Sequence, residues 1–343
     1  MTFKQLKTHI LQAPEYEFLK TNPKLGDNLI LLGLGGSWAY GTNTPESDID
    51  VRGIAANTCE EMLTGTCFEQ VLDNQTDTTI YSLNKIIKLL TDCNPNTIEI
   101  LGLKPEHYIY LTEIGKELLN NKDLFLSKKA ASTFGGYAYA QLRRLSNKAI
   151  RKVGQSEEEE HILHSVENAA RTFPEKYFEY PQDSIKLYIE DSPRDDFERE
   201  IFMDINLHHY PLRDWKGMWA EMNNVVKDYA SLGHRNKNAA ARGKIGKHQM
   251  HLIRLYMMAI DILRDGKIIT YREKEHDLLM KIRNNAFLDD NDQPTNEFYD
   301  MVEDYRAQME KAIEQSELPD KPRYKDIKKF QFEINKRIAE GDF

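Results

Sequence analysis

The chain has 343 residues, 40% of them apolar, and a formal net charge of −9. This length allows two domains of ordinary size, and the acidic balance argues against a protein that coats nucleic acid through bulk charge. Three cysteines without a Cys-x-x-Cys spacing argue against a disulfide framework or a zinc site and favour reduced thiols. The first residues lack the apolar core of a signal peptide, and no run approaches the ~18 apolar residues of a membrane helix. We therefore expect a cytoplasmic protein that does not contact a membrane.

The first third of the chain alternates short helical and strand patterns. Residues 3–20 carry apolar side chains at helical spacing, and Pro14 is expected to break that helix. Ser82 is suited to cap a helix that follows the last strand of this region. The residue patterns predict three strands, at 29–32, at 48–51 with an extension to residue 55, and at 78–81.

From about residue 126 onward the pattern is mainly helical. Long helices are predicted over residues 128–151 and 245–263, and the second half of the latter is apolar nearly all round, which predicts burial. Residues 181–215 are rich in Pro, Asp and Arg, so they are expected to be irregular. The highly charged tail from Pro319 onward is expected to be loosely attached.

The strongest chemical signal lies between the first two predicted strands. Gly35 and Gly36 let the backbone turn sharply and approach a ligand, and Ser37 is placed to start a short helix. Because the N–H groups at a helix start are free, this turn predicts a phosphate cradle. Residues two apart on a strand point to the same side, so the carboxylates of Asp48 and Asp50 are expected at one place.

A third carboxylate, Asp77, comes just before the third strand and is expected to converge with Asp48 and Asp50. Like charges ~4 Å apart repel by roughly 4 kcal/mol at an effective dielectric of ~20, so such a group takes up a proton or binds a cation. Oxygen ligands alone select a hard ion, most simply Mg²⁺, which also accepts substrate phosphates. The pattern predicts a two-ion site for in-line phosphoryl transfer, with Mn²⁺ as a substitute. The alternative for the Asp48–Asp50 pair taken alone is a solvated turn, and the alternative for Asp77 is an aspartate that ends a turn.

The run Gly35-Gly36-Ser37 followed by Asp48-Ile49-Asp50 resembles the signature of the DNA polymerase β-type nucleotidyltransferase superfamily. More narrowly, residues 36–53 resemble the YcgL-like, RNA-repair-associated predicted nucleotidyltransferases, although Trp38 stands where a small or basic residue is expected. Further similar stretches are residues 77–83, 94–99, 134–142 and 247–255. The resemblance implies Mg²⁺ dependence and transfer of a nucleoside monophosphate from an NTP with release of pyrophosphate. It also implies that Asp48 and Asp50 are metal ligands and that Asp77 is the third catalytic carboxylate.

A basic helix face forms a second candidate site. At about 100° per residue, its members fall within roughly a third of the helix circumference. The face could meet a triphosphate or a nucleic-acid phosphate, and the alternative is a solvated face or a set of interdomain salt bridges. It consists of Lys244, Lys247, His248, His251 and Arg254.

Together these features predict an α+β protein. A mixed-sheet nucleotidyltransferase catalytic domain is expected over residues 1–125, and a mainly α-helical substrate-binding domain over residues 126–343. The residues expected to hold the nucleotide are Gly35, Gly36, Ser37, Tyr40, Lys244, Lys247 and His251.

The favoured reaction joins a nucleoside monophosphate to an acceptor hydroxyl, with an RNA 3′ end, of a tRNA or of a broken RNA, as the acceptor. The RNA acceptor follows from the resemblance and the basic helix face, whereas the acidic net charge favours nucleotidylation of a protein or a small molecule. A third hypothesis is a nucleotide-binding regulatory or antitoxin-like module without turnover. The sequence leaves the base preference and the oligomeric state open.

Overall fold

The computed structural model describes residues 2–150, 163, 166, 170, 173–177, 180–181, 184–191, 199–226, 245–290 and 293–341. The chain divides into two compact units. Unit 1 comprises residues 1–142, 246–287 and 296–343, and unit 2 comprises residues 143–245 and 288–295. The boundaries of these units differ from the boundary after residue 125 that the sequence predicts between two functional domains. That functional boundary stays a prediction.

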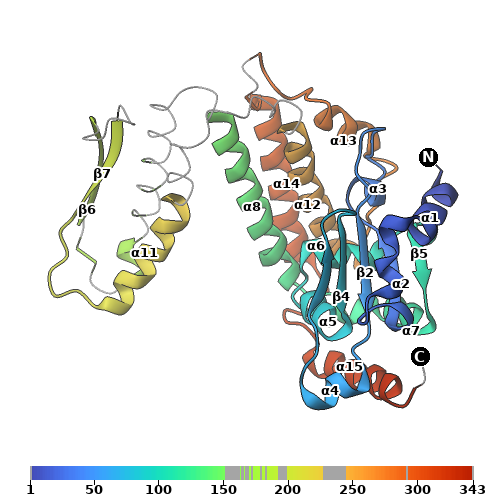
Figure 1. Ribbon diagram of the computed structural model, residues 1–343. Helices are drawn as coiled ribbons and strands as arrows, with labels where there is room; N and C mark the ends of the chain where they lie inside the picture. The colour runs from blue at the N-terminus through green and yellow to red at the C-terminus, as the bar shows by residue number, and fades with distance from the viewer. Residues whose placement is uncertain are drawn as a thin grey trace. The chain divides into compact units, whose positions relative to one another are not determined.

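A mixed sheet of five strands, in the order β3-β4-β2-β1-β5, is the scaffold of unit 1 (Figure 1). Strands β2 and β4 run parallel, and the other neighbouring pairs are antiparallel. The predicted α+β class with a mixed sheet is confirmed, and the three predicted strands correspond to β1, β2 and β4. The strands are β1 (Leu29–Leu34), β2 (Val51–Ala55), β3 (Gln70–Asp73), β4 (Thr78–Ser82) and β5 (Tyr108–Leu111).

Helices make up most of the other residues that the structure describes. The helix that follows β4 begins as predicted, because the Ser82 side chain accepts a hydrogen bond from the backbone N–H of Lys85. The first helix ends at Gln12, and Pro14 opens a separate 3₁₀ turn, which confirms the predicted break. The helices are α1 (Phe3–Gln12), α2 (Phe18–Thr21), α3 (Gly36–Tyr40), α4 (Cys59–Thr64), α5 (Leu83–Thr91), α6 (Pro95–Ile98), α7 (Glu113–Asn120), α8 (Lys129–Ile150), α10 (Phe173–Lys176), α11 (Leu212–Val226), α12 (Ile245–Asp265), α13 (His276–Arg283), α14 (Asn296–Gln315) and α15 (Tyr324–Ala339).

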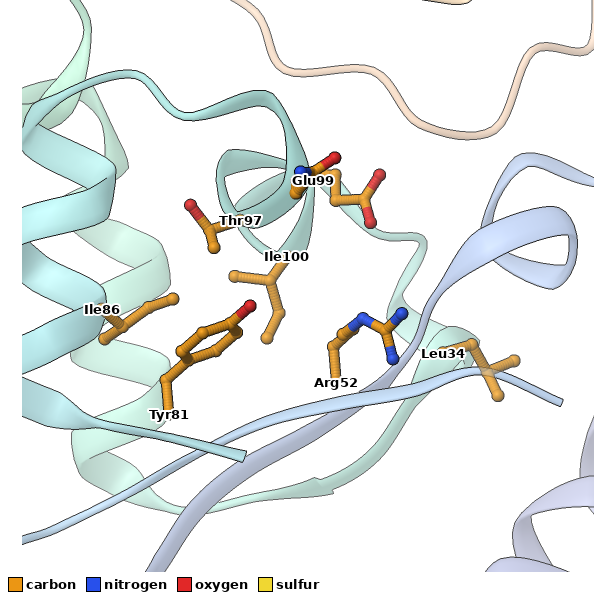
Figure 2. Close-up of a pocket in the computed structure, with 8 residues that line it drawn as sticks. Leu34, Arg52, Tyr81, Ile86, Thr97, Glu99 and Ile100 are labelled. Atoms are coloured by element: carbon orange, nitrogen blue, oxygen red, sulfur yellow. The ribbon is translucent and has the colours of Figure 1, made fainter. Parts of the chain in front are cut away.

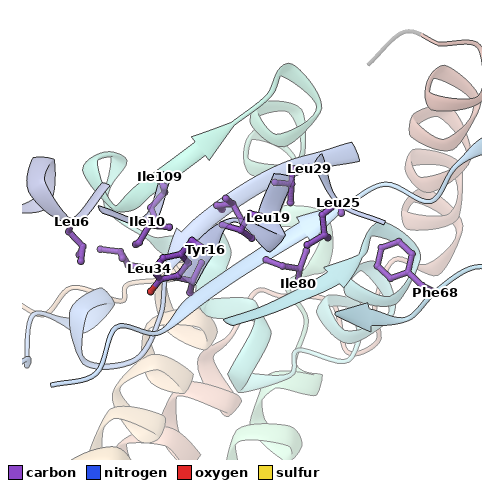
Figure 3. Packing of buried hydrophobic residues seen from close by; sticks show 13 residues of the cluster. Leu6, Ile10, Tyr16, Leu19, Leu25, Leu29, Leu34, Phe68, Ile80 and Ile109 are labelled. Atoms are coloured by element: carbon purple, nitrogen blue, oxygen red, sulfur yellow. The ribbon is translucent and has the colours of Figure 1, made fainter. Parts of the chain in front are cut away.

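The hydrophobic core of the sheet forms between α1, the turn after it and the central strands (Figure 3). All six residues of β1 are buried, as expected for a strand with neighbours on both sides. Helix α1 contributes Leu6 and Ile10, and the 3₁₀ turn contributes Tyr16, to one cluster that also holds Leu34 and Ile80. This packing fixes β1 and therefore the glycine turn at its end.

The helical part of unit 1 is built on α12. Every residue from Leu252 to Leu263 is buried, which confirms the burial predicted from the apolar second half of this helix. Gly266, with a φ of +61°, follows the end of α12. Helix α8 meets α14 where Gly135 faces the side chain of Met309.

The expectation of a loosely attached tail was wrong. Residues from Tyr324 onward form α15, which packs against α5 and the 3₁₀ turn at 122–125. Gln331 and Asn335 both donate hydrogen bonds to the side-chain oxygen of Asn84, at 2.7 and 2.8 Å. The charged residues that suggested detachment lie mostly on the solvent side, while Ile327 and Ile334 are buried at helical spacing.

Unit 2 contains a two-stranded antiparallel sheet that the sequence did not predict. Its strands are β6 (Ile185–Asp191) and β7 (Arg199–Ile205), so the expectation of an irregular segment over residues 181–215 was wrong for both. Apolar residues do alternate along β6, at Ile185, Leu187 and Ile189. Ile185 and Leu187 belong to a core cluster with Met218 and Met222 of α11, and this packing between residues distant in sequence stabilises the strand.

Among the residues that the structure describes, no helix is long and apolar enough to cross a membrane.

Candidate active site

The glycine turn after β1 is shaped by the residues that lie on it. Gly36 has a φ of +52°, and a Cβ atom there would lie 1.8 Å from Asp50 Oδ2. A Cβ on Gly35 would lie 3.0 Å from Arg52 Cγ. The backbone N–H of Gly35 donates to the carbonyl of Asp50 at 2.8 Å. The two glycines therefore leave room for an acid and an arginine to pack on the start of α3.

The parallel pairing of β2 with β4 places two acids side by side. Val51 pairs with Thr78, and the backbone N–H of Val51 donates to the carbonyl of Asp77 at 3.3 Å. Asp50 and Asp77 thus precede the two strands at the same level. Asp77 has a φ of +48°, an uncommon backbone conformation that only a minority of non-glycine residues adopt.

The proximity of the two acids affects the pKa of Asp50. Burial raises the pKa of Asp50 from its ordinary value of 3.8 to about 6. The positive charge of Arg52 opposes this rise, and the charge of Asp77 and a hydrogen bond between the two carboxyls add to it. Lys247 of α12 also lowers this pKa, so the start of that helix comes near the acid pair.

The strand that carries the acids begins later than predicted. β2 starts at Val51, so Asp48 and Asp50 lie in the segment before it, and the rule that residues two apart share a side does not apply to them. Asp48 is exposed, whereas Ile49 packs against the core cluster. The structure therefore brings Asp50 and Asp77 together and leaves Asp48 in solvent.

The fit of this site to a metal ion rests on two carboxylates. Within the described residues, no group of three His, Cys, Asp or Glu side chains is arranged to hold a metal. Mg²⁺ is often bound through one or two carboxylates, with water and substrate phosphates completing its shell, and the Asp50–Asp77 pair fits that pattern. The assignment of Asp48, Asp50 and Asp77 as a complete ligand set stays a prediction.

Arg52 is a site residue that the sequence analysis missed. Its Nη2 lies 3.4 Å from Asp50 Oδ1 and 4.0 Å from Asp77 Oδ1. Its Nη1 donates to the backbone oxygens of Asp77, at 2.8 Å, and of Val51. The signal was present, because Arg52 follows Asp50 by two positions at the start of the strand.

The predicted nucleotide contact Tyr40 lies in a buried polar cluster behind the glycine turn. Its hydroxyl donates to Glu99 Oε2 at 2.8 Å, and the Arg254 guanidinium lies 3.4 Å from the centre of its ring. Burial raises the pKa of both Tyr40 and Glu99, while the charges of Arg254 and then Arg52 lower that of Glu99. In the sequence, Glu99 is only the last residue of the family-like stretch 94–99, and that resemblance assigns it no role.

The basic face of α12 is divided between surface and interior. Lys247 is exposed, whereas Arg254 is only 8% exposed. His248 Nδ1 lies 2.6 Å from Gln141 Nε2, and His251 Nδ1 lies 3.4 Å from Arg254 Nη2. Lys244 falls outside the described residues. Roles for Lys247, His251 and Ser37 in holding a nucleotide stay predictions, and Ser37 is buried at the start of α3.

Residues 11–164 match the family described as the RNA repair pathway DNA polymerase beta family. The match supports the DNA polymerase β-type nucleotidyltransferase family for this part of the chain. The chain is also similar to the uncharacterized 38.9 kDa protein in the nrdC-mobD intergenic region of Enterobacteria phage T4, with 28% identity over 165 residues. That match covers 44% of this chain and 46% of the phage protein, so the chain spans less than half the length of the curated relative it matches. No solved structure matches the chain. The β1–α3 turn, β2 and β4 all lie within the stretch that matches the nucleotidyltransferase family.

Proposed function

We propose that the chain is a Mg²⁺-dependent nucleotidyltransferase that joins a nucleoside monophosphate to the 3′ hydroxyl of an RNA end, in the cytoplasm. The observation that carries the proposal is the Asp50 carboxylate, packed on the Cα of Gly36 and beside Asp77. The family match supports the reaction class, and its RNA repair association supports the acceptor. The three cysteines are free, as a reducing compartment requires.

The residues of this site would bind the metal ion and the nucleotide phosphates. Asp50 and Asp77 would hold Mg²⁺. The exposed Asp48, two residues before Asp50, would complete the coordination shell of the ion together with the substrate. When bound, the ion stabilises negative charge on the transferred phosphate and on the attacking oxygen. The backbone N–H groups at the start of α3 would face the nucleotide phosphates, and Lys247 would add a positive charge on the α12 side.

The test is a transfer assay with the full chain and α-labelled NTPs in the presence of Mg²⁺. The acceptors are RNA with a 3′ hydroxyl, the same RNA with a 3′ phosphate, DNA and a cell extract. We expect label on the hydroxyl-ended RNA together with pyrophosphate. The Asp48→Asn/Asp50→Asn double variant should lose both products and keep its circular dichroism spectrum.

A matched control is Glu273→Gln, which removes an exposed acid that pairs with Lys104. This variant should transfer at the wild-type rate. Label on a protein of the extract but not on RNA would replace the RNA acceptor with protein nucleotidylation. Undiminished transfer by the double variant, or NTP binding without pyrophosphate in every condition, would overturn the proposed chemistry.

A further inference from the structure

Arg52 occupies the position of a counter-cation between the two converging acids. Its Nη2 lies 3.4 Å from Asp50 Oδ1 and 4.0 Å from Asp77 Oδ1, so it forms an ion pair with both carboxylates. Its Nη1 is held by the backbone oxygens of Val51 and Asp77, at the strand ends that carry the acids. The positive charge of Arg52 therefore offsets part of the repulsion between the two carboxylates. A divalent ion bound at the same place would offset the same repulsion.

The Arg52 side chain also borders a second carboxylate. Arg52 and Glu99 line one pocket, and Figure 2 shows the guanidinium and the Glu99 carboxylate facing the same space. Tyr40 donates a hydrogen bond to Glu99 Oε2, and within the described residues Oε1 accepts none. Glu99 therefore has one oxygen available for a guanidinium.

A metal ion bound to the acid pair would repel the Arg52 guanidinium from its present position beside Asp50 and Asp77. A divalent ion held by Asp50 and Asp77 would lie a few ångströms from the present guanidinium, and like charges at that distance repel by several kcal/mol. The stem of Arg52 packs on Gly35, where a Cβ would come within 3.0 Å of Cγ. Because the stem packs there, an exchange of carboxylate partner would involve the end of the side chain beyond Cγ.

We propose that Arg52 is the resident counter-cation of the Asp50–Asp77 pair and moves to Glu99 when a divalent ion binds to that pair. This inference rests on the proposed function, because it takes the pair as the metal site. Arg52 is a positioning residue. Without metal it holds the two acids together against their repulsion, and with metal it leaves their oxygens to the ion.

The experiment measures Mn²⁺ binding to the full chain, without nucleotide, from the electron paramagnetic resonance signal of free Mn²⁺. Arg52→Gln removes the competing cation and should tighten binding at least about fivefold. Glu99→Gln removes the second partner and should weaken binding by a similar factor. In the Arg52→Gln/Glu99→Gln double variant, the second substitution should have no effect, because no arginine is left to move.

The double variant separates this exchange from a general charge effect. Glu99→Gln removes a negative charge near the site, so it could weaken cation binding without any motion of Arg52, but that loss would persist in the Arg52→Gln background. Additive effects of the two substitutions therefore overturn the inference. Thermal melts establish that each variant is folded, and Glu69→Gln, which removes the exposed partner of Lys85, should leave Mn²⁺ binding unchanged.

Asp50→Asn distinguishes the failure of this inference from the failure of the proposed function. If Asp50→Asn abolishes Mn²⁺ binding while the effects at Arg52 and Glu99 are additive, the metal site stands and the exchange is wrong. If Asp50→Asn binds Mn²⁺ as the wild type does, or no variant binds it, both the metal site and the exchange are wrong.

Discussion

Replacing Asp50 by asparagine should stabilise the metal-free protein at neutral pH. Burial, together with the charge of Asp77, raises the pKa of Asp50 from 3.8 to about 6, against the opposing effect of Arg52. A rise of that size corresponds to about 3 kcal/mol of differential interaction between the charged and neutral carboxyl. Because only 20% of the Asp50 side chain is exposed, solvent screening reduces this value little. Asparagine avoids the unfavourable charge and keeps the shape.

The sign of the pH dependence follows from proton uptake. The unfolded chain loses the Asp50 proton near pH 3.8, whereas the folded chain keeps it to about pH 6. Between these values the folded state binds more protons, so its free energy of unfolding falls as the pH rises, and the loss is complete above about pH 6. The free energy of unfolding of Asp50→Asn should therefore exceed that of the wild type by up to about 3 kcal/mol at pH 7.5. The difference should vanish as the pH approaches 4.

The assay is urea unfolding between pH 4 and 8 in a buffer with a metal chelator. Trp38 fluorescence reports unit 1 when Trp215 and Trp219 are replaced by phenylalanine. Asp48→Asn is the matched control, because it removes an exposed acid two residues away, and it should change stability by less than about 0.5 kcal/mol. Equal or lower stability of Asp50→Asn at pH 7.5 would show that the acid pair is not held under electrostatic strain.

Two further substitutions test the packing around the site. Gly36→Ala places a Cβ 1.8 Å from Asp50 Oδ2 at a φ of +52°, and it should lower the free energy of unfolding by more than the roughly 1–2 kcal/mol of the backbone effect alone. Gly65→Ala, at a φ of +71° with no atom within 4 Å of the new Cβ, measures that backbone effect, and equal losses in the two variants would refute the clash. Arg272→Met breaks a buried ion pair with an Nη1–Oδ2 distance of 2.6 Å and leaves the Asp261 side chain, which is 11% exposed, without this counter-charge. The free energy of unfolding measured in urea should fall by about 3–5 kcal/mol. Asp265→Asn, which removes the exposed partner of Arg264, should lower it by less than about 1 kcal/mol. Similar losses in the two variants would refute the role of burial.

Local signals predicted the parts of the fold that depend on neighbours in sequence. The serine before Leu83 caps α5, Pro14 ends α1, and the apolar run of α12 is buried, because capping, ring geometry and helical periodicity act within a few residues. The missed strands β3 and β5 have four residues each and lie at the two edges of the sheet. A short edge strand needs no regular apolar alternation, so its sequence carries little signal.

The candidate site was predicted in its residue types and only partly in its geometry. Gly35, Gly36, Asp50 and Asp77 come together as expected, but Asp48 remains exposed. The convergence of Asp50 with Asp77 comes from the parallel register of β2 and β4, which joins residues that are distant in sequence. Register of this kind depends on tertiary packing, and a spacing of two residues along one segment does not contain it.

The roles of the two glycines show how the sequence pattern and the structure differ in what they explain. The pattern suggests that Gly35 and Gly36 make room for a ligand, whereas the structure shows that the same space receives the side chains of Asp50 and Arg52. Because the Asp50 carboxylate packs on the backbone of the turn, it is partly buried, and this burial raises its pKa. The arginine packed beside it offsets part of that charge. Asp50, which we propose binds the metal, and Arg52, its proposed counter-cation, are thus positioned by one turn, and that turn requires glycine because of the protein's own side chains.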